Sequence, residues 1–180
     1  MTTIIVFNKP FRVMCQFSQV EGKKTLADYI DIPGVYAAGR LDYESEGLLV
    51  LTDDGKLQAR ITEPRHKQAK CYIAQIEKIP QPKTLIALGR GVRLKDGITR
   101  PARVRMIEEP DWLWSREPPI RQRREIPTRW LELEITEGKN RQVRRMTAAV
   151  GHPTLRLIRT RVASWSLDGL APGAYRELSL

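Results

Sequence analysis

The feature that most constrains the fold is a series of short apolar segments with no regular alternation of strands and helices. The strongest segment, Gly47–Thr52, is unbroken and predicts a strand buried on both faces. Other strands are predicted at Ile4–Phe7, Lys70–Ile76, Arg100–Ile107, Arg129–Thr136, Leu155–Val162 and Arg176–Leu180. Helices are predicted at Lys56–Thr62, Pro82–Leu88 and Arg141–Val150, with a helical turn at Thr25–Ile30. Many short strands and few helices favour an α+β fold with a mostly antiparallel sheet.

The segment Glu108–Pro127 differs from the rest of the chain. It holds four prolines, two tryptophans and four arginines and has no usable periodicity. We therefore predict a long surface loop, and long loops in small domains are often functional. The whole length of 180 residues suits one domain, or two small lobes around a shared core.

Positive charge is the main compositional signal. Thirty-one Lys and Arg residues against 21 Asp and Glu give a net charge of +10, which indicates a polyanionic partner. No apolar stretch is long enough to span a membrane, and the N-terminus lacks the pattern of a signal peptide. The expectation is a cytoplasmic, monomeric protein without a membrane partner. Cys15 and Cys71 are then expected to be buried thiols.

The predicted helix at 141–150 carries an unusual distribution of charge. Asn140 is a plausible N-cap, and the buried stripe is expected at Val143, Met146 and Val150. The first turns hold Arg141, Arg144 and Arg145. Exposed cations at that end of a helix each cost about 0.3–1 kcal/mol, whereas a bound anion would make them favourable.

Two interpretations of these cations remain open. The arginines could pair with surface acids, although few acids are close in sequence. They could instead bind nucleic acid, with Trp112, Trp114 and Trp130 stacking on unpaired bases, a combination that favours RNA. Burial in the core is the commoner fate of a tryptophan.

Only one group of residues in the sequence is a candidate catalytic site. The chain has two histidines and no Cys-x-x-Cys pair, so no metal site or cofactor is predicted. The stretch Gly39–Gly47 places acids beside an arginine at the entrance to the strongest strand. Asp42 suits a catalytic carboxylate there, but a turn or cap role fits the pattern equally well. A glycosidase pair of Glu44 and Glu46 ranks low, because such hydrolases do not need a strongly basic surface.

The same residues resemble a known family. Gly39-Arg40-Leu41-Asp42, continued through Ser45-Glu46-Gly47-Leu48-Leu49 to Leu51-Thr52-Asp53-Asp54-Gly55, resembles the signature of the RsuA-type pseudouridine synthases. The other motifs of that family have counterparts in the same order: Asn8-Lys9-Pro10, Lys70-Cys71-Tyr72, Glu137–Met146, and Leu157-Ile158-Arg159 with Pro172-Gly173 and Arg176-Glu177-Leu178. Five motifs in order cover nearly the whole chain, apart from the loop at 108–127.

The resemblance implies a fold and an activity. The expected fold is a mixed, mostly antiparallel sheet in two lobes around a central active-site cleft. The expected reaction isomerises a uridine of ribosomal RNA, of the 23S large-subunit type, to pseudouridine without a metal or cofactor. Many members carry an N-terminal S4 domain, whereas residues 1–180 are expected to form a single catalytic domain without one.

The resemblance also implies residue roles. Asp42 is the expected nucleophile, attacking either the uracil ring or the sugar carbon of a flipped-out nucleotide. Arg40 is expected to hold that nucleotide, Tyr72 to stack on its base, and Arg144 to pair with Asp42. Wider RNA contacts are expected from Lys9, Arg121, Arg123, Arg124, Arg141, Arg145 and Arg159. The alternative is a non-catalytic RNA-binding or assembly factor, against which the presence of Asp42 and Tyr72 argues.

Overall fold

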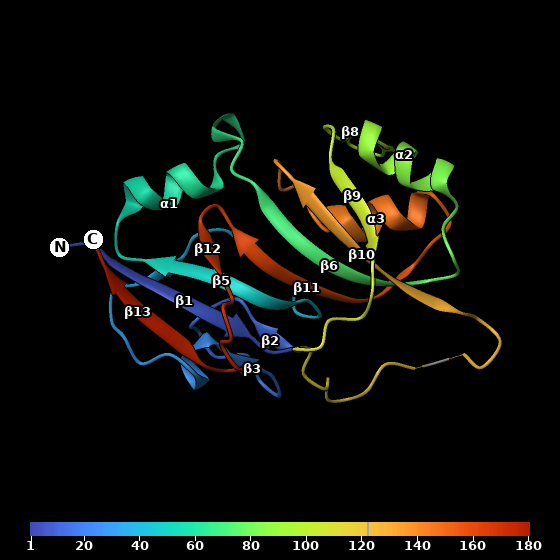
Figure 1. The fold of residues 1–180 in the computed structure, drawn as a ribbon. Helices are drawn as coiled ribbons and strands as arrows, with labels where there is room; N and C mark the ends of the chain where they lie inside the picture. The colour runs from blue at the N-terminus through green and yellow to red at the C-terminus, as the bar shows by residue number, and fades with distance from the viewer. Residues whose placement is uncertain (122) are drawn as a thin grey trace. The chain divides into compact units, whose positions relative to one another are not determined.

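The computed structural model describes residues 1–121 and 123–180. The chain divides into two compact units, whose strands and helices are drawn in Figure 1. The first unit comprises Met1–Gln68 and Ile158–Leu180, and the second comprises Ala69–Leu157. Both units contain short helices and a mixed or antiparallel arrangement of strands, which confirms the α+β class.

The first unit is built on a central apolar strand. Its elements are β1 (Thr3–Lys9), β2 (Val13–Met14), β3 (Lys24–Thr25), a 3₁₀ turn (Leu26–Asp28), β4 (Tyr36–Ala37), β5 (Glu46–Thr52), α1 (Gly55–Thr62), a second 3₁₀ turn (Pro64–His66), the end of β11 (Thr154–Val162), β12 (Trp165–Ser166) and β13 (Tyr175–Ser179). β1 pairs antiparallel with β13 and β5, while β5 runs parallel to β11 at Ile158 and Arg159. β4 also pairs with β5, and β12 with β11.

The core of this unit explains the unbroken apolar runs. β5 is buried along its whole length, as a strand with neighbours on both edges and both faces covered should be. On one face, side chains of β1 and β5 pack against residues from the segment between β1 and β5. This cluster includes Ile5, Phe7, Leu26, Ile30, Val35, Leu41, Leu49 and Leu51. Leu41 therefore anchors its neighbour Asp42 to the core.

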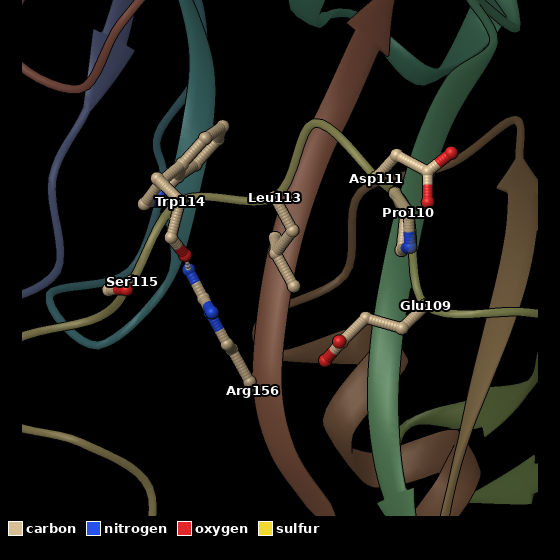
Figure 2. Close-up of a pocket in the computed structure, with 7 residues that line it drawn as sticks. All are labelled: Glu109, Pro110, Asp111, Leu113, Trp114, Ser115 and Arg156. Atoms are coloured by element: carbon tan, nitrogen blue, oxygen red, sulfur yellow. Dashed lines mark hydrogen bonds between the residues drawn. The ribbon is translucent and has the colours of Figure 1, made fainter.

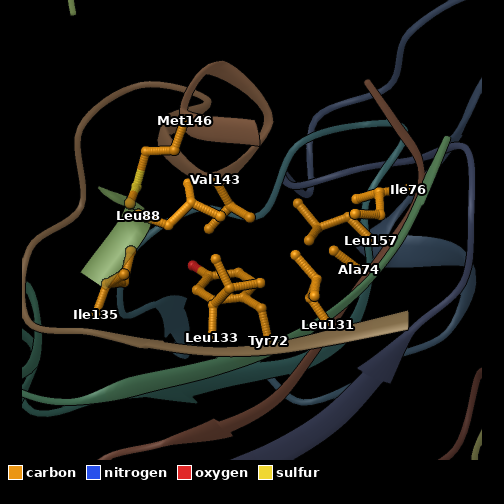
Figure 3. Packing of buried hydrophobic residues seen from close by; sticks show 10 residues of the cluster. All are labelled: Tyr72, Ala74, Ile76, Leu88, Leu131, Leu133, Ile135, Val143, Met146 and Leu157. Carbon is orange, nitrogen blue, oxygen red and sulfur yellow. The ribbon is translucent and has the colours of Figure 1, made fainter. Parts of the chain in front are cut away.

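The second unit places two helices on one face of a sheet. Its elements are β6 (Lys70–Glu77), α2 (Pro82–Arg90), β7 (Arg93–Leu94), β8 (Gly97–Ile98), β9 (Arg103–Ile107), β10 (Thr128–Ile135), α3 (Gln142–Ala149) and the start of β11. β10 pairs antiparallel with β6 and β9. Alternate residues of β6 and β10 pack against α2 and α3, as Figure 3 shows for Tyr72, Leu133, Leu88 and Val143.

The predicted elements are present, with shifts at their ends. Asp54 caps α1, accepting from the Lys56 and Leu57 amides at 2.9 and 3.2 Å. β9 begins at Arg103 rather than at residue 100, beyond Pro101, which has no amide hydrogen to donate. The segment 108–127 has no helix or strand in its described positions before Thr128, and position 122 of it lies outside the described residues.

The start of α3 differs from the prediction. Arg141, rather than Asn140, is the N-cap, in a left-handed conformation with φ of 50°. Val143 and Met146 are buried and Val150 packs at the edge of the same cluster, so the predicted stripe is confirmed. Across the described residues no helix is long and apolar enough to cross a membrane.

Candidate active site

Asp42 lies in a tight turn at the entrance to β5. The Ser45 amide donates to the Asp42 carbonyl at 3.0 Å, and the Arg12 amide donates to the Tyr43 carbonyl at 2.8 Å. The turn predicted as the alternative role of Asp42 is therefore real, but it uses the backbone of this residue. Asp42 is half-buried, while Leu41 before it and Ser45 after it are buried. The turn thus presents the Asp42 carboxylate from a fixed backbone.

The buried side chain of Lys9 donates hydrogen bonds to the backbone of this turn and of the segment after β1. Its side chain is 0% exposed, and Nζ donates to the carbonyls of Pro10, Val13 and Tyr43 at 3.0, 3.0 and 3.5 Å. Burial lowers the pKa of Lys9 from 10.5 to about 8, and the nearby acidic groups of Cys15, Glu46 and Asp42 oppose that shift. Because its ammonium is buried among carbonyls, Lys9 is a cation of the site and not the surface RNA contact that was predicted.

Arg159 on β11 is the second buried cation beside the turn. It is 4% exposed, and its Nε donates to the Leu48 carbonyl at 2.8 Å while Nη1 donates to the Arg40 carbonyl at 3.4 Å. Arg159 was expected to contact RNA, and in the structure its hydrogen bonds tie the turn and β5 together. The Arg40 side chain itself is exposed.

Gly47 permits the close approach of β5 and β11. Its φ is 106°, and a Cβ there would overlap the Arg159 carbonyl oxygen and lie 2.8 Å from the Arg159 amide nitrogen. Only glycine fits this position. The same turn separates the two carboxylates of the weak glycosidase hypothesis, because Glu44 is exposed and Glu46 is buried. That arrangement does not support a paired acid and base.

In the second unit, Tyr72 lies on β6 opposite Leu133 of β10. It is 9% exposed and packs in the cluster shown in Figure 3, which also contains Val143 and Met146 of α3. The packing agrees with that of an ordinary core aromatic residue. A stacking role at its remaining exposed edge stays a prediction.

The three arginines of α3 have different environments. Arg145 donates to both oxygens of Asp96, at 2.8 and 3.1 Å, and this interaction raises the pKa of Arg145 and lowers that of Asp96. Asp96 is 49 residues away in sequence, so this partner could not be predicted from the residues near Arg145 along the chain. Arg144 is half-buried and Arg141 is exposed. Arg141 is thus better placed than Arg145 for an anion outside the protein.

The loop at 108–127 presents its cations to solvent. Arg121, Arg123 and Arg124 are exposed, and Arg123 Nε lies 3.8 Å from Glu77 Oε1. Of the tryptophans, Trp130 is buried in the core as its strand position suggests, whereas Trp112 is 53% exposed. Stacking on RNA is therefore available to Trp112 and not to Trp130.

Two further cations lie near the Asp42 turn and were not predicted from the sequence. Arg12 is exposed in a left-handed conformation, and Lys23 places its Nζ 4.7 Å from the centre of the Tyr43 ring. The positive φ at Arg12 and the cation–π contact of Lys23 arise from tertiary structure and leave no local sequence signal. Together they add exposed positive charge around the Asp42 turn.

The arrangement has a definite chemical capacity. A half-buried carboxylate held by a rigid turn can attack an electrophilic carbon and later leave it. The buried ammonium of Lys9 and guanidinium of Arg159 provide fixed positive charge at the turn that carries this carboxylate. Among the described residues, no group of three His, Cys, Asp or Glu side chains could hold a metal ion.

A family profile matches most of the chain. Residues 3–149 match the RNA pseudouridylate synthase family, and the chain belongs to that family. The match includes the Asp42 turn, β5, Tyr72 and α3.

Particular relatives can then be named. The chain is 58% identical over 171 residues to the ribosomal large subunit pseudouridine synthase E of Xanthomonas axonopodis pv. citri, covering 94% of this chain and 90% of the relative. It is 55% identical over 177 residues to the protein of the same name from Vibrio vulnificus, covering 98% and 75%. A crystal structure of a pseudouridylate synthase aligns over 99% of this chain and 71% of that one, with a TM-score of 0.81 and 27% identity. The resemblance drawn from the five motifs is thereby confirmed.

Proposed function

We propose that this protein converts a uridine of large-subunit ribosomal RNA to pseudouridine, acting as a cytoplasmic monomer. The observation that carries the proposal is the Asp42 turn, fixed by Lys9 and Arg159, in a chain 58% identical to a large-subunit synthase. Relatives at this identity carry the name of one large-subunit synthase, which favours that subunit as the substrate.

The proposed reaction balances without a cofactor. The bond between N1 of uracil and C1′ of ribose breaks, and a bond between C5 and C1′ forms. The hydrogen on C5 is lost as a proton, and N1 gains a proton. Asp42 is the proposed nucleophile, attacking either the ring or the sugar carbon of a nucleotide that has left its stack.

Other residues receive supporting roles in the proposal. Exposed Arg40, beside the turn, holds the flipped nucleotide, and Tyr72 stacks on its base. Arg144 pairs with Asp42 and orients its carboxylate. Arg121, Arg123, Arg124 and Arg141 contact phosphates, which their exposure allows. Arg145 is left out of this set because Asp96 already holds its guanidinium.

The test follows from the chemistry at C5. A transcript of the large-subunit RNA labelled with tritium at C5 of uridine should release tritium with wild-type protein. Asp42→Asn, which keeps the size of the side chain, should abolish release while still binding the RNA. Glu44→Gln, an exposed carboxylate in the same turn, is the matched control and should retain activity. Release at the wild-type rate by Asp42→Asn would overturn the role of Asp42.

The same experiment addresses the alternative function. If the protein were a non-catalytic assembly factor, both wild type and Asp42→Asn would bind the transcript, and neither would release tritium. The half-buried, firmly held position of Asp42 favours the enzyme, since a nucleophile must be held in place at the reacting atom.

A further inference from the structure

The loop at 108–127 contains a pocket that the proposed reaction does not use. It has a volume of about 420 Å³, within the usual range for small-molecule sites, and lies entirely in the second unit. Figure 2 shows Trp114 and the end of Arg156 on one side of Leu113, with Glu109 and Asp111 on the other. An aromatic ring, a cation and two carboxylates therefore line one cavity.

The pocket is held by hydrogen bonds between the loop and the start of β11. Arg156 is only 5% exposed, and its Nη2 donates to the Trp114 carbonyl at 2.9 Å. Arg116 of the loop donates in the opposite direction, from Nη1 to the Leu155 carbonyl at 3.3 Å, and from Nε to the Pro118 carbonyl at 2.9 Å. These bonds from both sides hold the loop in one arrangement, which lowers the entropy cost of binding there.

An aromatic surface adjoins the pocket. The ring centres of Trp112 and Trp114 are 5.8 Å apart with their planes inclined at 40°, and Arg156 Cζ lies 6.0 Å from the Trp114 ring centre. Trp112 is more than half exposed, although burying an indole would be favourable. Exposed tryptophan beside a preformed cavity in a strongly basic protein suits stacking on an unpaired base.

The carboxylates determine which part of RNA can enter. Glu109 and Asp111 are exposed at the pocket and would repel a phosphate, but each accepts hydrogen bonds. Guanine presents two neighbouring donors, N1–H and the N2 amino group, on its Watson–Crick edge. Adenine and cytosine offer one amino group beside an acceptor, and uracil offers a single N–H between two acceptors. A carboxylate thus fits guanine best.

We propose that this pocket binds an unpaired guanine of the RNA substrate, stacked on Trp112 and Trp114 with its Watson–Crick edge toward Glu109 and Asp111. The exposed cations later in the loop, Arg121, Arg123 and Arg124, then contact the neighbouring phosphates. The inference rests on the proposed function for its choice of RNA, and it makes the loop an element that recognises sequence in the RNA substrate.

The test uses the whole protein and short single-stranded RNA. Four hexanucleotides are compared at one low salt concentration: all uridine, or uridine with one central guanine, adenine or cytosine. Wild type should bind the guanine probe about 10-fold more tightly than the all-uridine probe, from hydrogen bonds to charged acceptors. The double change of Glu109→Gln with Asp111→Asn should remove that preference. Glu108→Gln, an exposed neighbour outside the pocket, should keep it.

Stacking is tested separately. Trp112→Ala should weaken binding of the guanine probe by roughly 5- to 150-fold, while Trp112→Phe should restore most of it. Met106→Ala removes an exposed apolar side chain from β9 of the same unit and should bind as wild type does.

Several outcomes would overturn the proposal. Equal binding of the four probes, tighter binding of adenine or cytosine, or wild-type affinity in Trp112→Ala would each do so. The Asp42→Asn protein should show the guanine preference and release no tritium. If wild type prefers guanine but forms no pseudouridine, the proposed function fails and the guanine pocket stands. If wild type forms pseudouridine but shows no preference for guanine, only the proposed guanine pocket fails.

Discussion

The cations around the Asp42 turn and those of the 108–127 loop carry the same charge in very different settings. Lys9 and Arg159 are almost fully buried and donate to backbone carbonyls of their own unit. Arg121, Arg123 and Arg124 are exposed. The positive charge therefore divides into buried cations that hold the Asp42 turn together and solvent-exposed cations that can meet a polyanion, although Arg123 also lies near Glu77.

The difference has an energetic basis. Taking an ammonium or guanidinium out of water is costly unless its hydrogen bonds are replaced and opposite charges lie nearby. The Asp42 turn supplies both, through the carbonyls of Tyr43 and Arg40 and the carboxylate of Glu46. Removing a buried cation should therefore destabilise the fold, whereas removing an exposed one should affect binding alone.

The largest expected effect is at the strand contact that Arg159 shares with Gly47. Gly47→Ala should lower the free energy of unfolding by more than about 3 kcal/mol, because the new methyl group meets Arg159 backbone and φ is 106°. Gly22→Ala has a similar positive φ of 72° but open space around it, so it should cost only about 1–2 kcal/mol. Urea denaturation of both variants measures the difference. Equal losses would mean that the close approach of the strands is unimportant.

Arg159→Met should have the next largest effect. It leaves the carbonyls of Leu48 and Arg40 without their charged donor, for a loss of about 2–3 kcal/mol. The matched control is Arg124→Met, which should change the stability by less than about 0.5 kcal/mol. Thermal and urea unfolding measure both variants. An Arg159→Met protein as stable as the control would contradict a structural role for this buried cation.

Lys9 adds a smaller, pH-dependent contribution. Its pKa is about 8 in the folded state and near 10.5 when unfolded, so the unfolded state binds more protons between these values. Stability should consequently rise with pH across that window, by about 1 kcal/mol per pH unit more in wild type than in Lys9→Met. Unfolding free energies measured from pH 7.5 to 10.5 provide the two curves. Parallel curves would show that Lys9 titrates normally.

The loop cations should have the smallest effect on stability and a clear effect on binding. Replacing Arg121, Arg123 and Arg124 by Ala should leave the unfolding free energy within about 0.5 kcal/mol of wild type. The dependence of log affinity on log salt should flatten by roughly 0.7 for each lost contact with single-stranded RNA. Lys83, Arg90 and Arg93, also exposed in the second unit, form a control triple with the same change in charge. If the salt dependence of the loop variant equals that of wild type, the loop cations do not contact RNA phosphates.

Local sequence predicted most of the elements. The unbroken apolar run of β5 led to a strand in the right place, because a strand buried on both faces leaves a clear pattern in the sequence. Short strands such as β4 and β7 were missed, since two residues carry no period. The start of α3 was misplaced by one residue because Arg141 adopts a conformation that its residue type disfavours.

The site was predicted unevenly for a related reason. Asp42 was found from its place before β5 and from the family motif around it. The burial of Lys9 and Arg159 was not predicted, and both were expected to contact RNA. The ion pair of Arg145 with Asp96 was not predicted either. Each of these depends on residues distant in sequence, such as Asp96 for Arg145 and Leu48 for Arg159.

The sequence by itself determined the α+β class, the family motifs and the candidate nucleophile, because these follow from hydrophobic period and from residues adjacent along the chain. Tertiary structure alone decided which cations are buried, which tryptophan is exposed and where the loop forms a pocket. The reason is that the environment of a charge or ring depends on what folding brings against it. For Lys9 that is a set of carbonyls, and for Trp112 it is the ring of Trp114 beside open solvent.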